Sequence, residues 1–250
     1  MPAHTIAPQA GADGTATAAP DPAGAPAHAD AEPRPRSTGP AFDRGAFLAR
    51  FGIPADAAVA LFFGFVRPYK GLRHLVDALP AAVAAVPRLH LLVAGEFWLP
   101  ATGFAEQARG LGVADRLHLD DRYIANEDVG PYFRAADVLV MPYVEATQSG
   151  VVTLAVEFGV PIVATRVGGL PEAVADGETG LIVPPADPAA LAAALARVLT
   201  DDALRARLAE GAVRARERFG WAPLVALIEG LAPGPRAGAD DAQSSGFWSK

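Results

Sequence analysis

Short, continuously apolar runs recur along the chain and alternate with longer helical patterns. The apolar runs fall at residues 58–63, 89–94, 116–119, 138–141, 162–165 and 181–183. They lack a polar and apolar alternation and are rich in β-branched residues, as strands buried on both faces of a sheet are. Helical patterns lie between them at residues 72–85, 103–111, 127–136, 148–158 and 170–175. This order predicts an α/β fold with a Rossmann-like, doubly wound parallel sheet.

Composition divides the chain of 250 residues into three parts. Residues 1–40 are dominated by Ala, Pro, Gly, Thr and Asp, and bury too little apolar surface to offset the entropy of ordering. We therefore predict a disordered segment there and, for the same reason, a flexible tail at 233–250. Residues 41–232 have the size of one domain with a full hydrophobic core. After the last predicted strand this part is helical only, with Asp187 and Pro188 placed to begin a helix and further helices near 202–218 and 223–231.

Charge and residue types exclude several classes of protein. The net charge of −7 and the absence of a concentrated basic patch argue against nucleic-acid binding. Cysteine is absent, which excludes disulfides, thiolate metal sites and a cysteine nucleophile. His74, His90 and His118 are isolated and have no partner at ligand spacing, so we predict no metal site. Without a signal-peptide pattern or a membrane-length apolar run, we expect a cytoplasmic protein with no membrane span.

The loop at residues 64–71 follows the first predicted strand, and ligands of open α/β sheets bind beyond the carboxyl ends of the strands. Arg67 and Lys70 lie three residues apart in this loop, ahead of a helix. Two fixed cations at this place can neutralise a diphosphate and stabilise it as a leaving group. Two ordinary surface cations are the alternative interpretation.

A second loop, residues 142–150, ends in Thr147-Gln148-Ser149-Gly150 at the start of a predicted helix. Another helix begins after Gly168-Gly169, so two helix N-termini with unpaired N–H groups face one region. Such ends favour a phosphate-bearing ligand. A capping role for the hydroxyl of Thr147 or Ser149 is the alternative.

The standard nucleotide fingerprints are missing. No Gly-x-Gly-x-x-Gly follows a strand, which argues against a dinucleotide dehydrogenase, and there is no P-loop. Gly-x-Ser-x-Gly is also absent, so Ser149 is not in a nucleophile elbow.

Taken together, these segments resemble the nucleotide-sugar-binding C-terminal domain of family-4 retaining glycosyltransferases, which have the two-domain GT-B fold. The resemblance covers about residues 42–231, and Thr147-Gln148-Ser149-Gly150 is similar to one subgroup. The segments that carry it are residues 64–71, 93–96, 136–143, 147–151 and 168–181.

The resemblance implies roles for particular residues in binding a nucleoside-diphosphate sugar without a metal or cofactor. Arg67 and Lys70 would hold the diphosphate and stabilise it as the leaving group, and Glu145 would approach the sugar. The segment with Arg122, Tyr123 and Ile124 resembles the loop that contacts the base. The phosphate contacts implied by the resemblance come from Thr147, Gln148, Ser149, Gly150 and Val151.

Two departures from the family pattern leave several hypotheses open. The family commonly has two glutamates eight positions apart, the second of which bonds the ribose, and this chain has Ala146 and Leu154 there. The family's N-terminal acceptor domain also has no counterpart in the sequence. We expect a retaining transferase that is incomplete alone, or half of a split enzyme with a partner chain that supplies the acceptor domain. A non-catalytic nucleotide-sugar-binding module and, more distantly, a UDP-sugar epimerase are the alternatives.

Overall fold

A computed structural model describes residues 42–147 and 149–219 of the chain. The segments predicted to be disordered or flexible, residues 1–40 and 233–250, lie outside the described residues, as does the helix predicted near 223–231. No helix among the described residues is long and apolar enough to cross a membrane.

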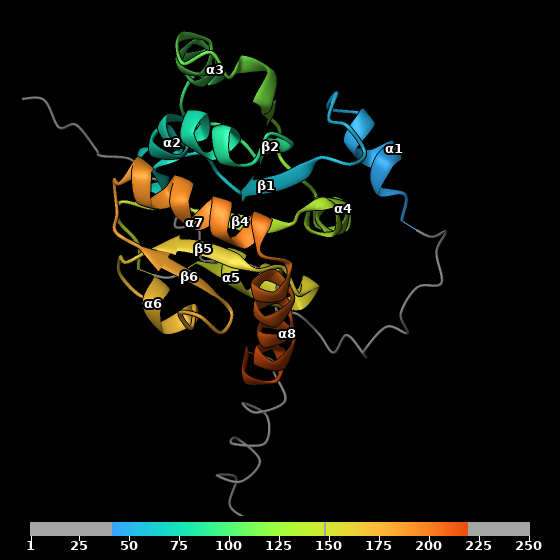
Figure 1. Cartoon of the computed structure of the whole chain (residues 1–250), viewed down its shortest axis with the longest axis vertical. Helices are drawn as coiled ribbons and strands as arrows, with labels where there is room; N and C mark the ends of the chain where they lie inside the picture. Colours follow the sequence, from blue (N-terminus) through green and yellow to red (C-terminus); the bar gives the residue numbers. More distant parts are fainter. Residues whose placement is uncertain (1–41, 148, 220–250) are drawn as a thin grey trace, which may run out of the picture. The chain divides into compact units, whose positions relative to one another are not determined.

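Six parallel strands form one sheet in the order β3-β2-β1-β4-β5-β6 (Figure 1). The strands are β1 (Ala58–Phe63), β2 (Leu89–Ala94), β3 (Leu117–Asp120), β4 (Val138–Met141), β5 (Ile162–Thr165) and β6 (Gly180–Val183). Four of the predicted runs coincide with strands; the run at 116–119 is shifted by one residue from β3, and the run at 181–183 begins one residue after β6 does. The predicted Rossmann-like doubly wound sheet is confirmed.

Helices cover both faces of this sheet. They are α1 (Arg44–Ala49), α2 (Leu72–Ala85), α3 (Ala101–Gly110), α4 (Val129–Ala135), α5 (Gly150–Phe158), α6 (Leu170–Ala173), α7 (Pro188–Thr200) and α8 (Asp202–Phe219). The side chain of Asp187 accepts a hydrogen bond from the N–H of Ala190 at 2.9 Å, so the predicted start of α7 is confirmed.

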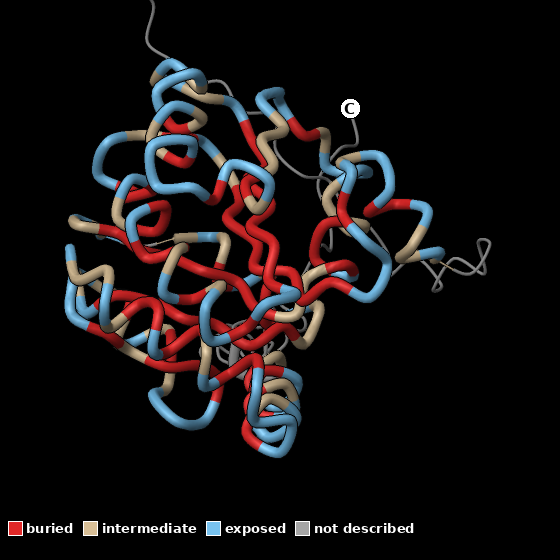
Figure 2. Tube along the Cα trace, turned by 45° about the horizontal axis from the view of Figure 1, so that its top comes forward, coloured by how far each residue is buried: buried red, intermediate tan, exposed pale blue. Residues whose placement is uncertain are grey.

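The two faces of β1 explain why its sequence shows no alternation of polarity. Alternate residues Ala58, Ala60 and Phe62 pack in one apolar layer with α2, α3 and α7. The intervening residues of β1 belong to a second layer with α1, α4, α5 and α6. Every residue of β1 and β2 is buried, and Figure 2 shows buried segments gathered in the centre with exposed segments around them. A strand that is covered on both faces must be apolar throughout.

Helix α1 was not predicted, and it helps to hold the amino edge of the sheet. Asp43 caps it by accepting from the N–H of Ala46 at 2.9 Å. Arg44 pairs with Asp137 at 3.0 Å, and Asp137 also accepts from the N–H of Val59 at 2.8 Å. The guanidinium of Arg44 donates further to the carbonyl oxygens of Ala55, Ala57 and Ala135. We call Arg44 and Asp137 the amino-edge clasp; these contacts give Asp137 a structural role.

His90 and His118 are not isolated, contrary to the sequence-based prediction. Pairing of β2 with β3 brings their rings together, and Nδ1 of His90 lies 2.9 Å from Nε2 of His118. Burial, with a smaller contribution from Arg116, lowers the pKa of His90 below its usual value of 6.5. Burial and the neighbouring His90 lower the pKa of His118 in the same direction. The two rings therefore form a neutral hydrogen-bonded pair at neutral pH.

This pair is expected to make folding sensitive to mild acid. Because the folded pKa values are lowered, the unfolded chain takes up protons first as the pH falls below about 6.5, and stability is lost from there downward. Acidification from pH 7.5 to 5.5 should lower the free energy of unfolding more in the wild type than in the variant with both His90→Leu and His118→Leu. Urea unfolding at the two pH values measures the difference, with His74→Gln as the control. Equal losses in wild type and double variant would contradict the prediction.

Candidate functional site

A cavity of about 670 Å³ lies at the carboxyl edge of the sheet, where β1 and β4 are neighbours. The chain leaves β1 toward β2 and leaves β4 toward β5, in opposite directions along the sheet. The two following loops separate at this point, which is where ligands bind in doubly wound sheets. The cavity is lined by Phe63, Gly64, Phe65, Tyr69, Lys70, Tyr143, Glu145, Ala146, Thr147, Ser149, Gly150, Val151 and Leu154. We call this space the main cavity.

Lys70 gives the main cavity a buried positive charge. The residue ends a short 3-10 helix, η1 (Pro68–Lys70), and is only 7% exposed. Its ammonium has no salt-bridge partner among the described residues and lies 5.4 Å from the ring centroid of Tyr143. Burial, and secondarily the charge of Arg67, lowers the pKa of Lys70 to about 8. An unpaired buried cation is costly, so this wall of the cavity favours an anionic ligand.

The start of α5 approaches the same point as the ammonium of Lys70. A Cβ atom at Gly64 would lie 3.1 Å from Nζ of Lys70 and 3.7 Å from Cγ2 of Val151. Ser149 is the N-cap residue, but its side chain makes no capping hydrogen bond. Its hydroxyl lies 3.3 Å from the Tyr143 hydroxyl, so the capping alternative is wrong for this side chain. A lysine ammonium and the first N–H groups of a helix together suit a phosphate.

Two glycines allow the loops around the main cavity to pack closely. Gly71 has φ +66°, and a Cβ there would lie 2.0 Å from the carbonyl oxygen of Pro142. Gly168 has φ +49°, and a Cβ there would lie 1.6 Å from the carbonyl oxygen of Ala146. No other residue type fits either position without moving the loop after β4.

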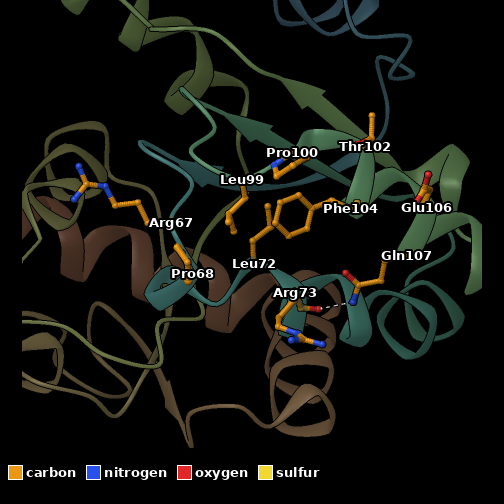
Figure 3. Close-up of a pocket in the computed structure, with 11 residues that line it drawn as sticks. Arg67, Pro68, Leu72, Arg73, Leu99, Pro100, Thr102, Phe104, Glu106 and Gln107 are labelled. Atoms are coloured by element: carbon orange, nitrogen blue, oxygen red, sulfur yellow. Dashed lines mark hydrogen bonds between the residues drawn. The ribbon is translucent and has the colours of Figure 1, made fainter. Parts of the chain in front are cut away.

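Arg67 lies in a different cavity from Lys70. It lines an apolar space of about 450 Å³ beside α2 and α3, with Leu72, Leu99 and Phe104 (Figure 3). In Figure 3 its guanidinium extends away from these three side chains. The guanidinium carbon lies 3.7 Å from the ring centroid of Trp98, and the buried Nε has no partner among the described residues. The two predicted diphosphate ligands are close in sequence, but the structure does not bring them into one cavity.

A smaller cavity of about 310 Å³ continues from the main cavity and shares Phe63, Gly64, Phe65 and Leu154 with it. We call it the side cavity. Its remaining lining residues are Gly95, Glu96, Tyr123, Ile124, Asn126 and Val129. Two residues of the predicted base-contacting segment, Tyr123 and Ile124, therefore lie at the site.

The third residue of that segment, Arg122, lines neither the main cavity nor the side cavity. Its Nε pairs with Asp120 at 3.1 Å, and its guanidinium donates to the hydroxyl of Tyr132 at 2.8 Å. These contacts tie the loop after β3 to α4, which is a structural role. Contact of Arg122 with a base stays a prediction.

The loop after β4 supplies the outer wall of the main cavity. Glu145 and Thr147 are exposed there, and the carbonyl oxygen of Thr147 accepts from the N–H of Gly169 at 3.0 Å. Gln148 lies outside the described residues. The sequence-based reasoning missed Tyr143, Glu96 and Asn126 as lining residues, although all three follow strands and the rule for carboxyl-edge loops applies to them.

The described residues contain no group of three or more His, Asp or Glu placed to hold a metal ion. A Rossmann-like sheet with an anion-favouring cavity at its carboxyl edge defines a ligand-binding α/β domain. The chain belongs to the family Glycosyl transferases group 1, whose sequence profile matches residues 57–201.

Proteins that are similar to this chain in sequence or in structure are consistent with its membership of this family. The D-inositol 3-phosphate glycosyltransferase of Streptomyces avermitilis is 38% identical over 190 residues, which are 73% of this chain and 41% of that protein. The chain thus spans less than half the length of this relative. Sucrose-phosphate synthase from Thermosynechococcus elongatus is 31% identical with a TM-score of 0.62, over 74% of this chain and 47% of that one. Anabaena HepE, solved in complex with UDP, has a TM-score of 0.65 at 22% identity, over 75% and 51% of the two chains.

Proposed function

We propose that this chain is the donor-binding part of a retaining glycosyltransferase and binds a nucleoside-diphosphate sugar in the main and side cavities. The observation that carries the proposal is the buried, unpaired ammonium of Lys70 beside the first turn of α5. This pair of features has the charge and the N–H groups that a diphosphate needs. No metal or cofactor is part of the proposal.

The base of the nucleotide would lie in the side cavity. Tyr123 offers an aromatic ring that is 63% exposed, and Ile124 offers a buried apolar wall. Glu96 and Asn126 add the polar groups with which a base edge can be bonded. A diphosphate bound at Lys70 would then point the donor sugar toward Glu145 and Thr147 on the outer wall.

Transfer with retention would need an acceptor site that these residues do not supply. The matched region covers 41% of the relative from Streptomyces avermitilis. From the resemblance of its motifs we infer that the chain corresponds to the C-terminal half of a GT-B protein of the Thr-Gln-Ser-Gly subgroup. The acceptor would be held by an N-terminal domain, on this polypeptide or on a partner chain. Glu145 would approach the sugar, and the acceptor itself is left open.

Calorimetric titration with UDP-, GDP- and ADP-sugars tests the proposal. We expect one base to bind with a dissociation constant at least tenfold lower than the other two, since Glu96 and Asn126 can pair with only some base edges. A folded protein, judged by circular dichroism, that binds none of the donors would refute donor binding.

A non-catalytic binding module is the second candidate, and one observation favours it. Leu154 and Ala146 both line the main cavity at the positions where the family commonly has glutamates. Donor hydrolysis by the chain is measured as release of nucleoside diphosphate. Release of sugar by the chain alone would exclude the non-catalytic module.

Trp98 should report whether Arg67 moves onto the diphosphate. In a variant with phenylalanine at positions 221 and 248, emission comes from Trp98, which is stacked under the Arg67 guanidinium at 3.7 Å. We expect nucleotide titration to change this emission, because Arg67 must leave the ring to reach the ligand. The same titration with Arg67→Met added is the control and should leave the emission constant. Unchanged emission despite calorimetric binding would show that Arg67 stays on Trp98 and that Lys70 acts without it.

A further inference from the structure

Among the described residues, no side chain that lines both the main cavity and the side cavity can form a hydrogen bond; we call the place where the two cavities meet the junction. The four residues that line both cavities are Phe63, Gly64, Phe65 and Leu154. The N–H of Gly64 is already used, because it donates to the carbonyl oxygen of Ala94 at 2.9 Å. The carboxylates of Glu145 and Glu96 line one cavity each, and neither residue lines both cavities.

The junction is where the pentose of a bound nucleotide has to lie. The cationic wall with Lys70 is in the main cavity, whereas the base-sized space with Ile124 and Asn126 is in the side cavity. In a nucleoside diphosphate the pentose is the only link between the base and the phosphates. A nucleotide that fills both cavities therefore passes its pentose between Gly64 and Leu154.

The chemistry of the junction decides what kind of pentose fits. A site built to hydrogen-bond a hydroxyl rejects the analogue without it by a large factor, because its own polar group is left unpaired. An apolar wall has no such group and distinguishes the two ligands weakly. Leu154 presents an apolar wall where the resemblance to family-4 enzymes leads us to expect a ribose-bonding glutamate.

We propose that Leu154 removes selection for ribose, so that this domain takes 2′-deoxynucleoside diphosphates and their sugars as readily as the ribonucleotide forms. The inference rests on the proposed donor binding and adds a specificity to it. A ribose hydroxyl at this junction loses water without gaining a partner among the described side chains, and its removal costs no hydrogen bond with these side chains.

The test is calorimetry with UDP, 2′-deoxy-UDP and 2′,3′-dideoxy-UDP on the full chain, repeated with the corresponding guanosine and adenosine diphosphates. For the base that binds, we expect the three dissociation constants to agree within about threefold. A carboxylate that bonds the ribose would instead favour the ribonucleotide by about 10- to 150-fold, the range for a hydrogen bond to a charged group.

Leu154→Glu should restore the selection by placing a carboxylate at the junction. We expect this variant to bind the ribonucleotide at least tenfold more tightly than the deoxy form, whatever its absolute affinity. Thr153→Glu is the matched control, because it adds the same charge at an exposed neighbouring position of α5 that lines neither cavity. For Thr153→Glu, the ratio of the dissociation constants of the deoxynucleotide and the ribonucleotide should equal the ratio in the wild type.

The outcomes separate this inference from the proposed function. If no nucleotide binds to the folded wild type, the donor-binding proposal fails. If ribonucleotides bind more than tenfold more tightly than deoxynucleotides to the wild type, donor binding stands and the inference about Leu154 is overturned. A Leu154→Glu variant that folds and binds without a changed ratio would place the pentose elsewhere and would also overturn it.

Discussion

Replacing Lys70 by methionine is expected to weaken nucleotide binding and, at the same time, to stabilise the protein. Methionine keeps the length of the buried side chain and removes its charge. The loss of one charge-assisted contact to a diphosphate should raise the dissociation constant by about 10- to 150-fold. The free energy of unfolding at pH 7 should rise by up to about 3 kcal/mol, because burial lowers the pKa of Lys70 from 10.5 to about 8 and each unit corresponds to about 1.4 kcal/mol.

The dependence on pH gives this prediction a second measurement. Between pH 8 and 10.5 the folded lysine is neutral while the unfolded chain still binds the proton, so the stability of the wild type rises with pH in this window. The stability gap between Lys70→Met and wild type should therefore close as the pH rises from 8 to 10.5. Nucleotide affinity should fall above pH 8 in the wild type and stay constant in the variant. Urea unfolding and calorimetry measure the two quantities.

Arg73→Met is the matched control, since it removes an exposed cation of α2 that does not line the main cavity. It should change neither the affinity for nucleotide nor the stability by more than about 0.5 kcal/mol. A Lys70→Met variant that is less stable than wild type and binds nucleotide normally would assign Lys70 a structural role.

Gly71→Ala is expected to be strongly destabilising. The substitution places a side chain at φ +66° and a Cβ atom 2.0 Å from the carbonyl oxygen of Pro142, so the backbone after β1 or β4 has to move. The unfavourable backbone conformation and the overlap together should cost about 2 to 5 kcal/mol, which lowers Tm by about 5 to 15 °C in a domain of this size. Thermal unfolding followed by circular dichroism measures the shift.

Gly112→Ala isolates the contribution of the overlap. Gly112 has φ +73°, close to that of Gly71, but a Cβ there would meet nothing within 4 Å. The Gly112→Ala substitution should therefore lower the free energy of unfolding by only about 1 to 2 kcal/mol, which is the cost of the backbone conformation alone. Equal losses of stability in Gly71→Ala and Gly112→Ala would mean that the loops can move apart at no cost in free energy. Gly71 would then be required only for its backbone conformation.

The sheet could be predicted from the sequence because its strands are buried on both faces. In β1, alternate residues from Ala58 to Phe63 enter different layers, and both layers demand apolar side chains. The uninterrupted apolar run is the direct result of this packing. The position of the main cavity could be predicted as well, because the loops after two neighbouring strands separate where the connections of these strands run in opposite directions.

The distribution of side chains between cavities could not be predicted. Arg67 and Lys70 lie three residues apart in sequence, but η1 turns Lys70 inward while Arg67 stacks on Trp98 of the next loop. A contact of that kind depends on the conformation of two loops, about which sequence spacing says little. The pairing of His90 with His118 was missed for a related reason, because strand register brings together residues that are far apart along the chain.

The amino-edge clasp and the main cavity lie at opposite ends of the same strands. Arg44 and Asp137 bind backbone groups at the amino ends of β1 and β4, and the proposed contacts with the diphosphate follow the carboxyl ends of the same two strands. Substitutions that retune the ligand can therefore accumulate at one end without loosening the contacts at the other.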